Sequence, residues 1–222
     1  MIKDYYSTLD KIIDEYEIDK CSLASGKEIF IFYPKLFVLS IVSLFEKEIK
    51  SLVNNIVTNP TITLPPLSAI VRKYPNKYID RIYGQLMAYE DGGIVTLKAD
   101  GFYDIFGGNS FKNNVESCFS SLRVHELGEY QKTLALLKPL IDTSPTYEND
   151  YIKNDEIHER FDNLTFLYAE TAFLKLKLRR NKVAHNFISG MSDSFEDIRN
   201  LFYDAVLYAV ALKTTLKSLS TI

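Results

Sequence analysis

The stretch Leu178-Arg179-Arg180-Asn181-Lys182-Val183-Ala184-His185 closes a long segment of helical periodicity, residues 161–184. A turn is expected at 186–192, followed by a last helix that reaches about residue 219. Ser194 and Asp197 have the three-residue spacing of a helix-capping pair at its start. Behind this cap, apolar residues recur at helical spacing: Ile198, Leu201, Phe202, Ala205, Tyr208, Ala209 and Leu212. Two long helices joined by a short turn predict an all-α protein, most typically a helical bundle.

The remainder of the chain also shows mainly helical periodicity. Further helices are predicted at residues 2–16, 34–59, 76–90, 110–124 and 128–141. Pro34 suits the first turn of the second of these helices. Breaks are expected around residues 21–26, in the proline-rich segment 59–66 and at Ser144-Pro145.

Residues 91–109 are the least helical part of the sequence. They contain Gly92-Gly93, Gly101 and Gly107-Gly108, and the run Ile94-Val95-Thr96-Leu97 predicts a short strand. The last glycine pair has no Lys-Ser/Thr pair after it, so we interpret it as a turn rather than a phosphate loop. We therefore expect one domain over residues 1–222, with an irregular insertion at about 91–109.

Composition indicates a folded protein with a sizeable core. Of the 222 residues, 46% are hydrophobic and 25% are charged. The two cysteines, Cys21 and Cys118, fit neither a disulfide framework nor a metal motif. The amino terminus shows no apolar signal core, and the most apolar stretch, residues 36–45, is too short to cross a bilayer. We expect a cytoplasmic protein with reduced cysteines, no membrane partner and no cofactor or metal.

The charge distribution is uneven although the formal net charge is only −3. No acidic residue lies between Glu170 and Asp193, whereas five cations fall close together: Lys175, Lys177, Arg179, Arg180 and Lys182. Such a basic island is suited to capturing a phosphate backbone locally. Equally, cations at this position stabilise the negative end of a helix dipole. The sequence leaves both interpretations open.

The run Arg180-Asn181-Lys182-Val183-Ala184-His185 combines an arginine, a polar residue and, after a gap of four, a histidine. At a helix end, before a turn and a terminal core helix, this pattern resembles the signature of the HEPN superfamily. The longer run from Leu178 to His185 looks especially like the RiboL-PSP-HEPN group. Residues 36–52, with the run Ser43-Leu44-Phe45-Glu46-Lys47-Glu48, are similar to that group's early helix.

The resemblance implies a HEPN-like bundle of four to five core helices that forms a homodimer. It also implies a metal-independent ribonuclease site in which the two motifs meet across the dimer interface. Helix geometry is consistent with this, because at 100° per residue Arg180 and His185 diverge by about 140°. Either the helix unwinds near Ala184 or a second chain supplies the complementary groups. Members of the family often act as toxins or in phage defence, so an antitoxin or another defence partner is expected as well.

The chemistry expected of this motif is attack of an RNA 2′-hydroxyl on the adjacent phosphate. His185 would move the protons, because histidine changes its charge between pH 5 and 8. Arg180 would stabilise negative charge on the phosphorane, and Asn181 would orient the imidazole or bind the phosphate. Candidate phosphate contacts are Arg179, Lys182 and Lys177.

Weaker candidates have simpler interpretations. Glu46 is a possible accessory residue, but it lies four positions from Lys50 and is more typical of a helix-surface ion pair. His125 and His158 have no partner at metal-ligand spacing, so we expect them to be exposed helix residues. The alternative to a ribonuclease is a non-catalytic helical module that binds RNA or a protein through the same basic helix end. A pure binder does not need the histidine, so the intact motif favours the enzyme.

Overall fold

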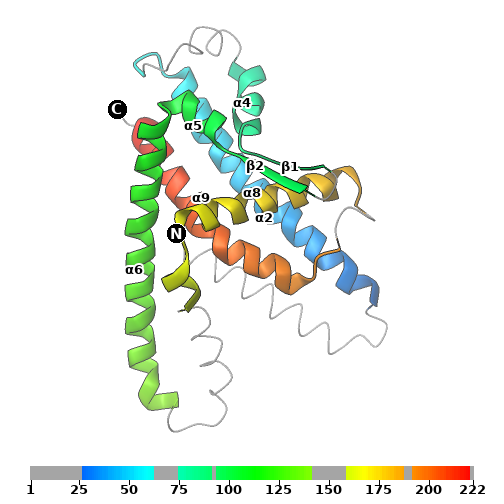
Figure 1. Cartoon of the computed structure of the whole chain (residues 1–222), viewed down its shortest axis with the longest axis vertical. Helices are drawn as coiled ribbons and strands as arrows, with labels where there is room; N and C mark the ends of the chain where they lie inside the picture. Colours follow the sequence, from blue (N-terminus) through cyan, green and yellow to red (C-terminus); the bar gives the residue numbers. More distant parts are fainter. Residues whose placement is uncertain (1–26, 63–74, 92–93, 142–158, 188–191, 221–222) are drawn as a thin grey trace.

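The computed structural model describes residues 27–62, 75–91, 94–141, 159–187 and 192–220. These ranges are mostly helical and contain one small antiparallel hairpin (Figure 1). The labelled elements are α2 (Lys27–Thr58), α4 (Pro75–Gly84), β1 (Met87–Asp91), β2 (Ile94–Lys98), α5 (Asp100–Phe106), α6 (Asn109–Ile141), α8 (Phe166–His185) and α9 (Phe195–Ser220). The predicted helical character is therefore confirmed. The predicted helix 2–16 and the breaks at 21–26 and 144–145 lie outside the described residues.

The core forms where α2, α8 and α9 pack together, with α6 along the outer side of α9 (Figure 1). Aromatic side chains fill the centre of this packing. The Phe45 ring lies 6.1 Å from the rings of both Phe173 and Phe202, and Phe173 lies 5.3 Å from Tyr208. The apolar stripe predicted for the last helix is buried except for Leu201, which is partly exposed. The middle of α9 is buried on its other faces as well, since residues 204–212 are all buried. Burial of this stripe fixes α9 against α8, and with it the position of the motif helix.

A polar group lies inside this core. The Tyr103 hydroxyl of α5 donates a hydrogen bond to the Glu170 carboxylate of α8, and it lies 2.8 Å from the Tyr208 hydroxyl of α9. Glu170 is only 7% exposed, and this burial raises the pKa of its carboxyl group. A buried carboxyl group is tolerated here because the tyrosine hydroxyl satisfies it. The contact ties three helices together.

Helix α2 differs from its predicted start. It begins at Lys27, so Pro34 lies inside the helix and not in its first turn. A proline inside a helix removes one backbone hydrogen bond and crowds the preceding turn. Burial of Phe37, Val38 and Val42 on the same helix offsets this cost, since each is at most 4% exposed.

The segment around the hairpin corrects two predictions. The helix predicted at 76–90 ends at Gly84, and its last residues form strand β1. The predicted strand at 94–97 is confirmed as β2, which pairs with β1 in antiparallel register. Residues 100–106 are helical, so the insertion at 91–109 is not irregular throughout. The turn at Gly107-Gly108 is confirmed. The two glycines have φ angles of 123° and 63°, a backbone conformation that residues with a Cβ atom disfavour.

Two helix boundaries were also predicted wrongly. The helices predicted at 110–124 and 128–141 are one continuous helix, α6, because a single glycine, Gly128, does not interrupt it. The segment predicted as one helix at 161–184 is divided at residues 164–165. The Thr165 hydroxyl there accepts a hydrogen bond from the Tyr168 amide, which caps the start of α8. By contrast, the predicted Ser194–Asp197 cap is confirmed by reciprocal hydrogen bonds.

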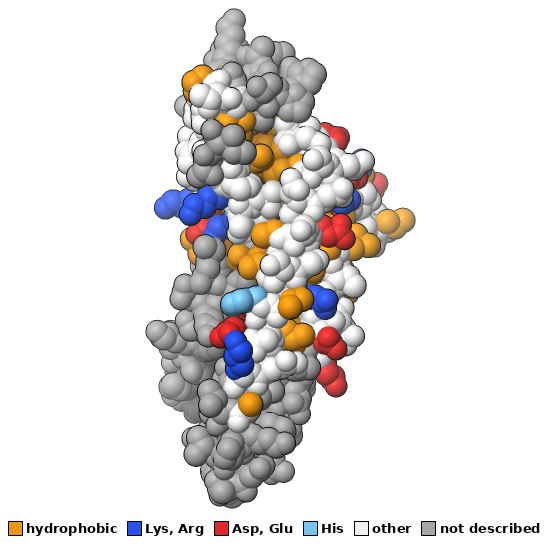
Figure 2. All heavy atoms as spheres, turned by 90° about the vertical axis from the view of Figure 1, so that its left-hand side faces the viewer, with side chains coloured by type: hydrophobic (Ala, Val, Ile, Leu, Met, Phe, Trp, Pro, Cys, Tyr) orange, Lys and Arg blue, Asp and Glu red, His pale blue; other side chains and the backbone are white. Residues whose placement is uncertain are grey.

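The surface on the α6 side gives no sign of a basic patch among its described residues. Figure 2 looks onto this side, where the described lysine and arginine side chains are scattered among acidic and hydrophobic ones. Among the described helices, none combines the length and the apolar character that a membrane crossing requires.

Candidate active site at the end of helix α8

The motif histidine is the last residue of α8 and is exposed. Regular helical hydrogen bonding continues to this end, since the Asn186 amide donates to the Lys182 carbonyl at 2.9 Å. Val183 is buried and anchors the last turn, whereas Ala184 and His185 are exposed. Within the described part of the chain, the His185 imidazole makes no hydrogen bond or ion pair with a neighbouring side chain. The imidazole is therefore presented at the surface by a regular helix end.

The intact helix bears on the two alternatives that the sequence left open. The helix does not unwind near Ala184 but continues through His185. Arg180 and His185 consequently keep the divergence expected of a regular helix. Within the described ranges, no contact joins these two side chains.

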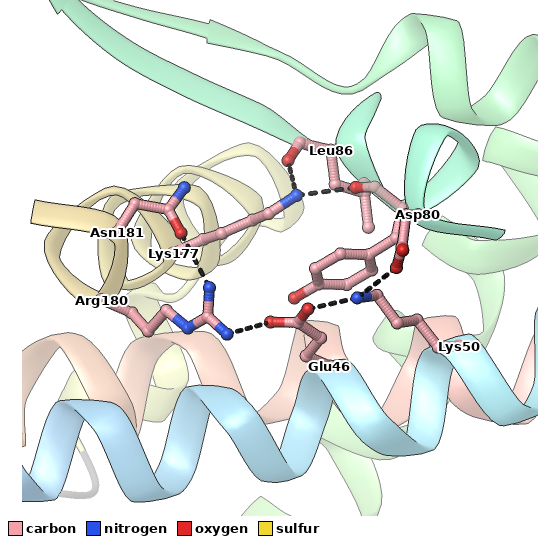
Figure 3. Close-up of polar contacts among 8 residues, drawn as sticks. Glu46, Lys50, Asp80, Leu86, Lys177, Arg180 and Asn181 are labelled. Carbon is pink, nitrogen blue, oxygen red and sulfur yellow. Dashed lines mark hydrogen bonds and ion pairs between the residues drawn. The ribbon is translucent and has the colours of Figure 1, made fainter. Parts of the chain in front are cut away.

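The Arg180 guanidinium is fixed from two sides. Its Nη2 lies 2.9 Å from Oε2 of Glu46 on α2, and its Nη1 donates to Oδ1 of Asn181 at 3.1 Å (Figure 3). The Arg180 side chain is still 28% exposed. Asn181 thus steadies the arginine in this structure, whereas the sequence suggested that it orients the imidazole or binds the phosphate.

Glu46 connects the motif arginine to two other helices. Its second carboxylate oxygen pairs with Lys50, one helical turn along α2, as predicted. Lys50 in turn lies 2.7 Å from Asp80 of α4. Burial acts to lower the pKa of Lys50, but the contacts with Asp80 and Glu46 outweigh it, so that the pKa is raised. The Glu46 side chain is only 15% exposed, so its two ion pairs are partly shielded from solvent, whereas Asp80 is 73% exposed.

Lys177 lies inside the protein, which corrects its prediction as a phosphate contact. Its side chain is 7% exposed, and its Nζ donates to the carbonyl oxygens of Tyr83, at 2.6 Å, and of Leu86 (Figure 3). The Tyr83 carbonyl lies in the last turn of α4, where a helix has acceptors without intrahelical donors, and Leu86 follows the end of that helix. Burial, helped by the nearby charges of Lys50 and Arg180, lowers the pKa of Lys177 to about 7 against the opposing charge of Glu46. Lys177 therefore joins α8 to α4 and to the residue just before β1.

Tyr83 completes the buried side of this cluster. The Lys177 Nζ lies 3.9 Å from the centre of its ring. Its hydroxyl group is buried and has no hydrogen-bond partner among the described residues. Burial, followed by the negative charge of Glu46, raises the pKa of this hydroxyl.

The other two predicted phosphate contacts are paired with acidic residues. The Arg179 Nη2 lies 2.7 Å from the Asp193 carboxylate, and the Lys182 ammonium pairs with Glu90 of β1. Lys182 retains 43% exposure of its side chain. Acids from distant parts of the chain thus offset the basic island, so its charge in the fold is lower than the local sequence indicates. The roles of Arg179 and Lys182 in phosphate binding remain predictions.

The remaining candidates lie away from this cluster. His125 is exposed on α6, as expected, 3.7 Å from the neighbouring Glu126 carboxylate. Cys118 is a free thiol, and its burial raises its pKa. Cys21 and His158 lie outside the described residues. Across the ranges that the structure describes, no three or more His, Cys, Asp or Glu side chains group as metal ligands would.

Comparisons of this chain with protein families, with curated proteins and with solved structures find no match. The functional assignment therefore depends on the motif and on the contacts that hold it.

Proposed function

We propose that this protein is a metal-independent endoribonuclease whose catalytic residues are His185 and Arg180, assisted by Asn181. The observation that carries the proposal is the contrast between the two motif residues. His185 is exposed at a regular helix end, while Arg180 is held by Glu46 and Asn181 and is still partly exposed. A positioned guanidinium and an accessible imidazole are the two groups that this chemistry needs.

In this mechanism the imidazole of His185 moves protons. The RNA 2′-oxygen attacks the adjacent phosphorus while its proton is removed, and the bond to the 5′-oxygen breaks as that oxygen gains a proton. The products are a 2′,3′-cyclic phosphate and a 5′-hydroxyl. Histidine is suited to either transfer near neutral pH, and an exposed imidazole can reach a bound backbone.

Arg180 would stabilise the negative charge that develops on the phosphorane oxygens. A guanidinium carries five N–H donors, and the contacts to Glu46 and Asn181 use one each. The other donors are available to phosphate oxygens without loss of those contacts. Because Glu46 and Asn181 fix the guanidinium before the substrate arrives, little orientational freedom is lost during the reaction.

The proposal includes a symmetric homodimer with a HEPN-like fold, in which each centre takes Arg180 and His185 from different chains. The continuous helix supports this arrangement, because it keeps the two side chains of one chain apart. Repulsion between two basic helix ends is reduced by the ion pairs of Arg179 and Lys182. Phe187 and Ile188, just past the motif, are the candidate apolar contacts of such an interface, or they cover the core of their own chain. Phe187 is half-buried against that core and offers little area to a partner, and Ile188 lies outside the described residues. A role as a toxin or in phage defence, with an antitoxin as partner, belongs to the same proposal.

The test is incubation of the purified protein with total RNA in EDTA, followed by mapping of the cut ends. Cleavage should persist and should leave 2′,3′-cyclic phosphate and 5′-hydroxyl ends. His185→Ala should lower the rate by roughly 100-fold or more and keep most RNA binding. Loss of activity in EDTA with recovery in Mg²⁺ would contradict the mechanism, as would undiminished cleavage by His185→Ala.

The composite site has its own test, in which Arg180→Ala and His185→Ala chains are mixed. If each centre combines residues of two chains, a mixed dimer regains one intact centre and part of the activity. If both residues act within one chain, mixing restores nothing. Full activity of a strictly monomeric protein at micromolar concentration would refute the composite site.

A non-catalytic module that binds RNA or a protein is the second candidate. The ion pairs of Arg179, Arg180 and Lys182 favour it, because they give these cations a structural role without any substrate. This alternative predicts that His185→Ala changes neither RNA binding nor RNA integrity.

A further inference from the structure

The β1–β2 hairpin has an inner and an outer face. The register pairs Ala88 with Leu97, and both are half-buried against the core. Directly opposed residues in antiparallel strands share a face, and neighbours along a strand alternate. The outer face therefore carries Met87, Tyr89, Asp91, Ile94, Thr96 and Lys98.

Two contacts fix this hairpin beside the motif. Lys177 binds the carbonyl of Leu86 just before β1, and Lys182 pairs with Glu90 near the end of β1. The strand thus runs alongside α8 toward the helix end that bears His185 (Figure 1). Glu90 shares the inner face with Ala88, as this contact requires, so Tyr89 projects to the opposite side.

The outer face presents an aromatic ring next to a cation. Tyr89 is 43% exposed, and Lys98 on the neighbouring strand holds its Nζ 6.0 Å from the centre of the ring. Proteins that bind single-stranded nucleic acid commonly combine an exposed aromatic side chain with an adjacent cation. A base stacks on the ring, and a phosphate lies near the cation.

We propose that the outer face of the β1–β2 hairpin, through Tyr89 and Lys98, binds a single-stranded segment of the RNA substrate beside the cleaved phosphate. This inference rests on the proposed ribonuclease function, and it assigns to the hairpin a role in choosing unpaired substrate. Lys98 is the one cation among the outer-face residues, and Asp91 lies at the other end of the hairpin. Stacking therefore dominates, and the salt dependence from this face matches about one phosphate, a slope near −0.7.

The first experiment measures stacking without cleavage. The chain contains no tryptophan, so Tyr89→Trp introduces a single indole, whose fluorescence can be excited selectively. A short mixed-sequence RNA with 2′-O-methyl groups cannot be cut by the proposed chemistry and serves as the probe. Its binding should quench the indole fluorescence of the Tyr89→Trp protein. The matched control is Tyr168→Trp, because Tyr168 is 60% exposed but lies in the first turn of α8, at the other end from the motif. No quenching in Tyr89→Trp, or equal quenching in both variants, overturns the proposal.

The second experiment measures cleavage kinetics of Tyr89→Val, which keeps a good strand residue. The KM for a single-stranded substrate should rise roughly 5- to 100-fold with kcat unchanged, whereas Tyr168→Val should alter neither. Lys98→Ser provides a second variant and should weaken the salt dependence of binding. An unchanged KM in Tyr89→Val overturns the hairpin proposal even if RNA is cut. Conversely, quenching of the Tyr89→Trp reporter by the 2′-O-methyl probe, with no cleavage of the same sequence as unmodified RNA by the wild type, would contradict the ribonuclease and leave the hairpin as a binding surface.

Discussion

Lys177 gives a stability prediction that the structure makes quantitative. Its pKa is lowered from 10.5 to about 7 by burial, so above pH 7 the folded protein loses a proton that the unfolded chain keeps. Stability rises with pH wherever the unfolded state binds more protons. The free energy of unfolding should therefore increase between pH 7 and pH 9, and the shift corresponds to about 2 kcal/mol over this window. The neutral amine still has two N–H groups for the carbonyls of Tyr83 and Leu86, so those hydrogen bonds survive deprotonation.

The assay is urea unfolding of the wild type and of Lys177→Met at pH 7, 8 and 9. Lys177→Met should be less stable than the wild type, since two carbonyl groups lose their donor. Its free energy of unfolding should not increase between pH 7 and pH 9. Lys175→Met is the matched control, because Lys175 lies two positions earlier on α8 and is not buried. The free energy of unfolding of Lys175→Met should still increase between pH 7 and pH 9. A wild-type stability that is flat or falls over this range, or a rise that persists in Lys177→Met, would refute the reasoning.

Three further predictions concern the polar groups around the site and in the core. Glu46→Gln should lower the free energy of unfolding by about 1–3 kcal/mol, because Arg180 and Lys50 lose their shared anion; an unchanged urea midpoint would show that the ion pairs contribute nothing. Tyr83→Phe removes a buried hydroxyl group that has no partner among the described residues, so stability should stay level or rise by up to about 1 kcal/mol; a clear loss in the same assay would mean that the hydroxyl is bonded in solution. Because the pKa of Glu170 is raised, its carboxyl group stays protonated to a higher pH in the folded protein than in the unfolded chain. The free energy of unfolding should therefore fall as pH rises above 4.5. Glu170→Gln should remove that fall in unfolding curves measured at pH 4 and pH 7, and an equal fall in both proteins would disprove the assignment.

Local signals identified most of the helices. Periodicity and the Ser194–Asp197 cap located α9, and the periodic run ending at Ala184 located the end of α8 to within one residue. The glycine pair at 107–108 marked its turn because of the backbone conformation that it permits. Each of these signals depends on residues that are close together in the sequence.

The errors that matter for the site arose where tertiary contacts decide the structure. The run Met87-Ala88-Tyr89-Glu90 contains good helix formers, yet it forms a strand because it pairs with β2 and packs on α8. Neither the burial of Lys177 nor the pairing of Arg180 with Glu46 has a local signal, since the partners are separated by 91 to 134 positions. The candidate motif itself was visible in the sequence, whereas the ion pairs of its cations with Glu46, Glu90 and Asp193 were not.

The central claim is attack by the RNA's own 2′-hydroxyl, with His185 as the proton carrier and no metal required. The most direct measurement uses a DNA oligonucleotide that contains one ribonucleotide, incubated with the protein in EDTA. The mechanism predicts a single cut directly after the ribonucleotide, with a cyclic phosphate end, absent from the all-deoxy oligonucleotide and strongly reduced in His185→Ala. Cleavage of the all-deoxy strand, or a cut after the ribonucleotide that His185→Ala performs equally well, would contradict it.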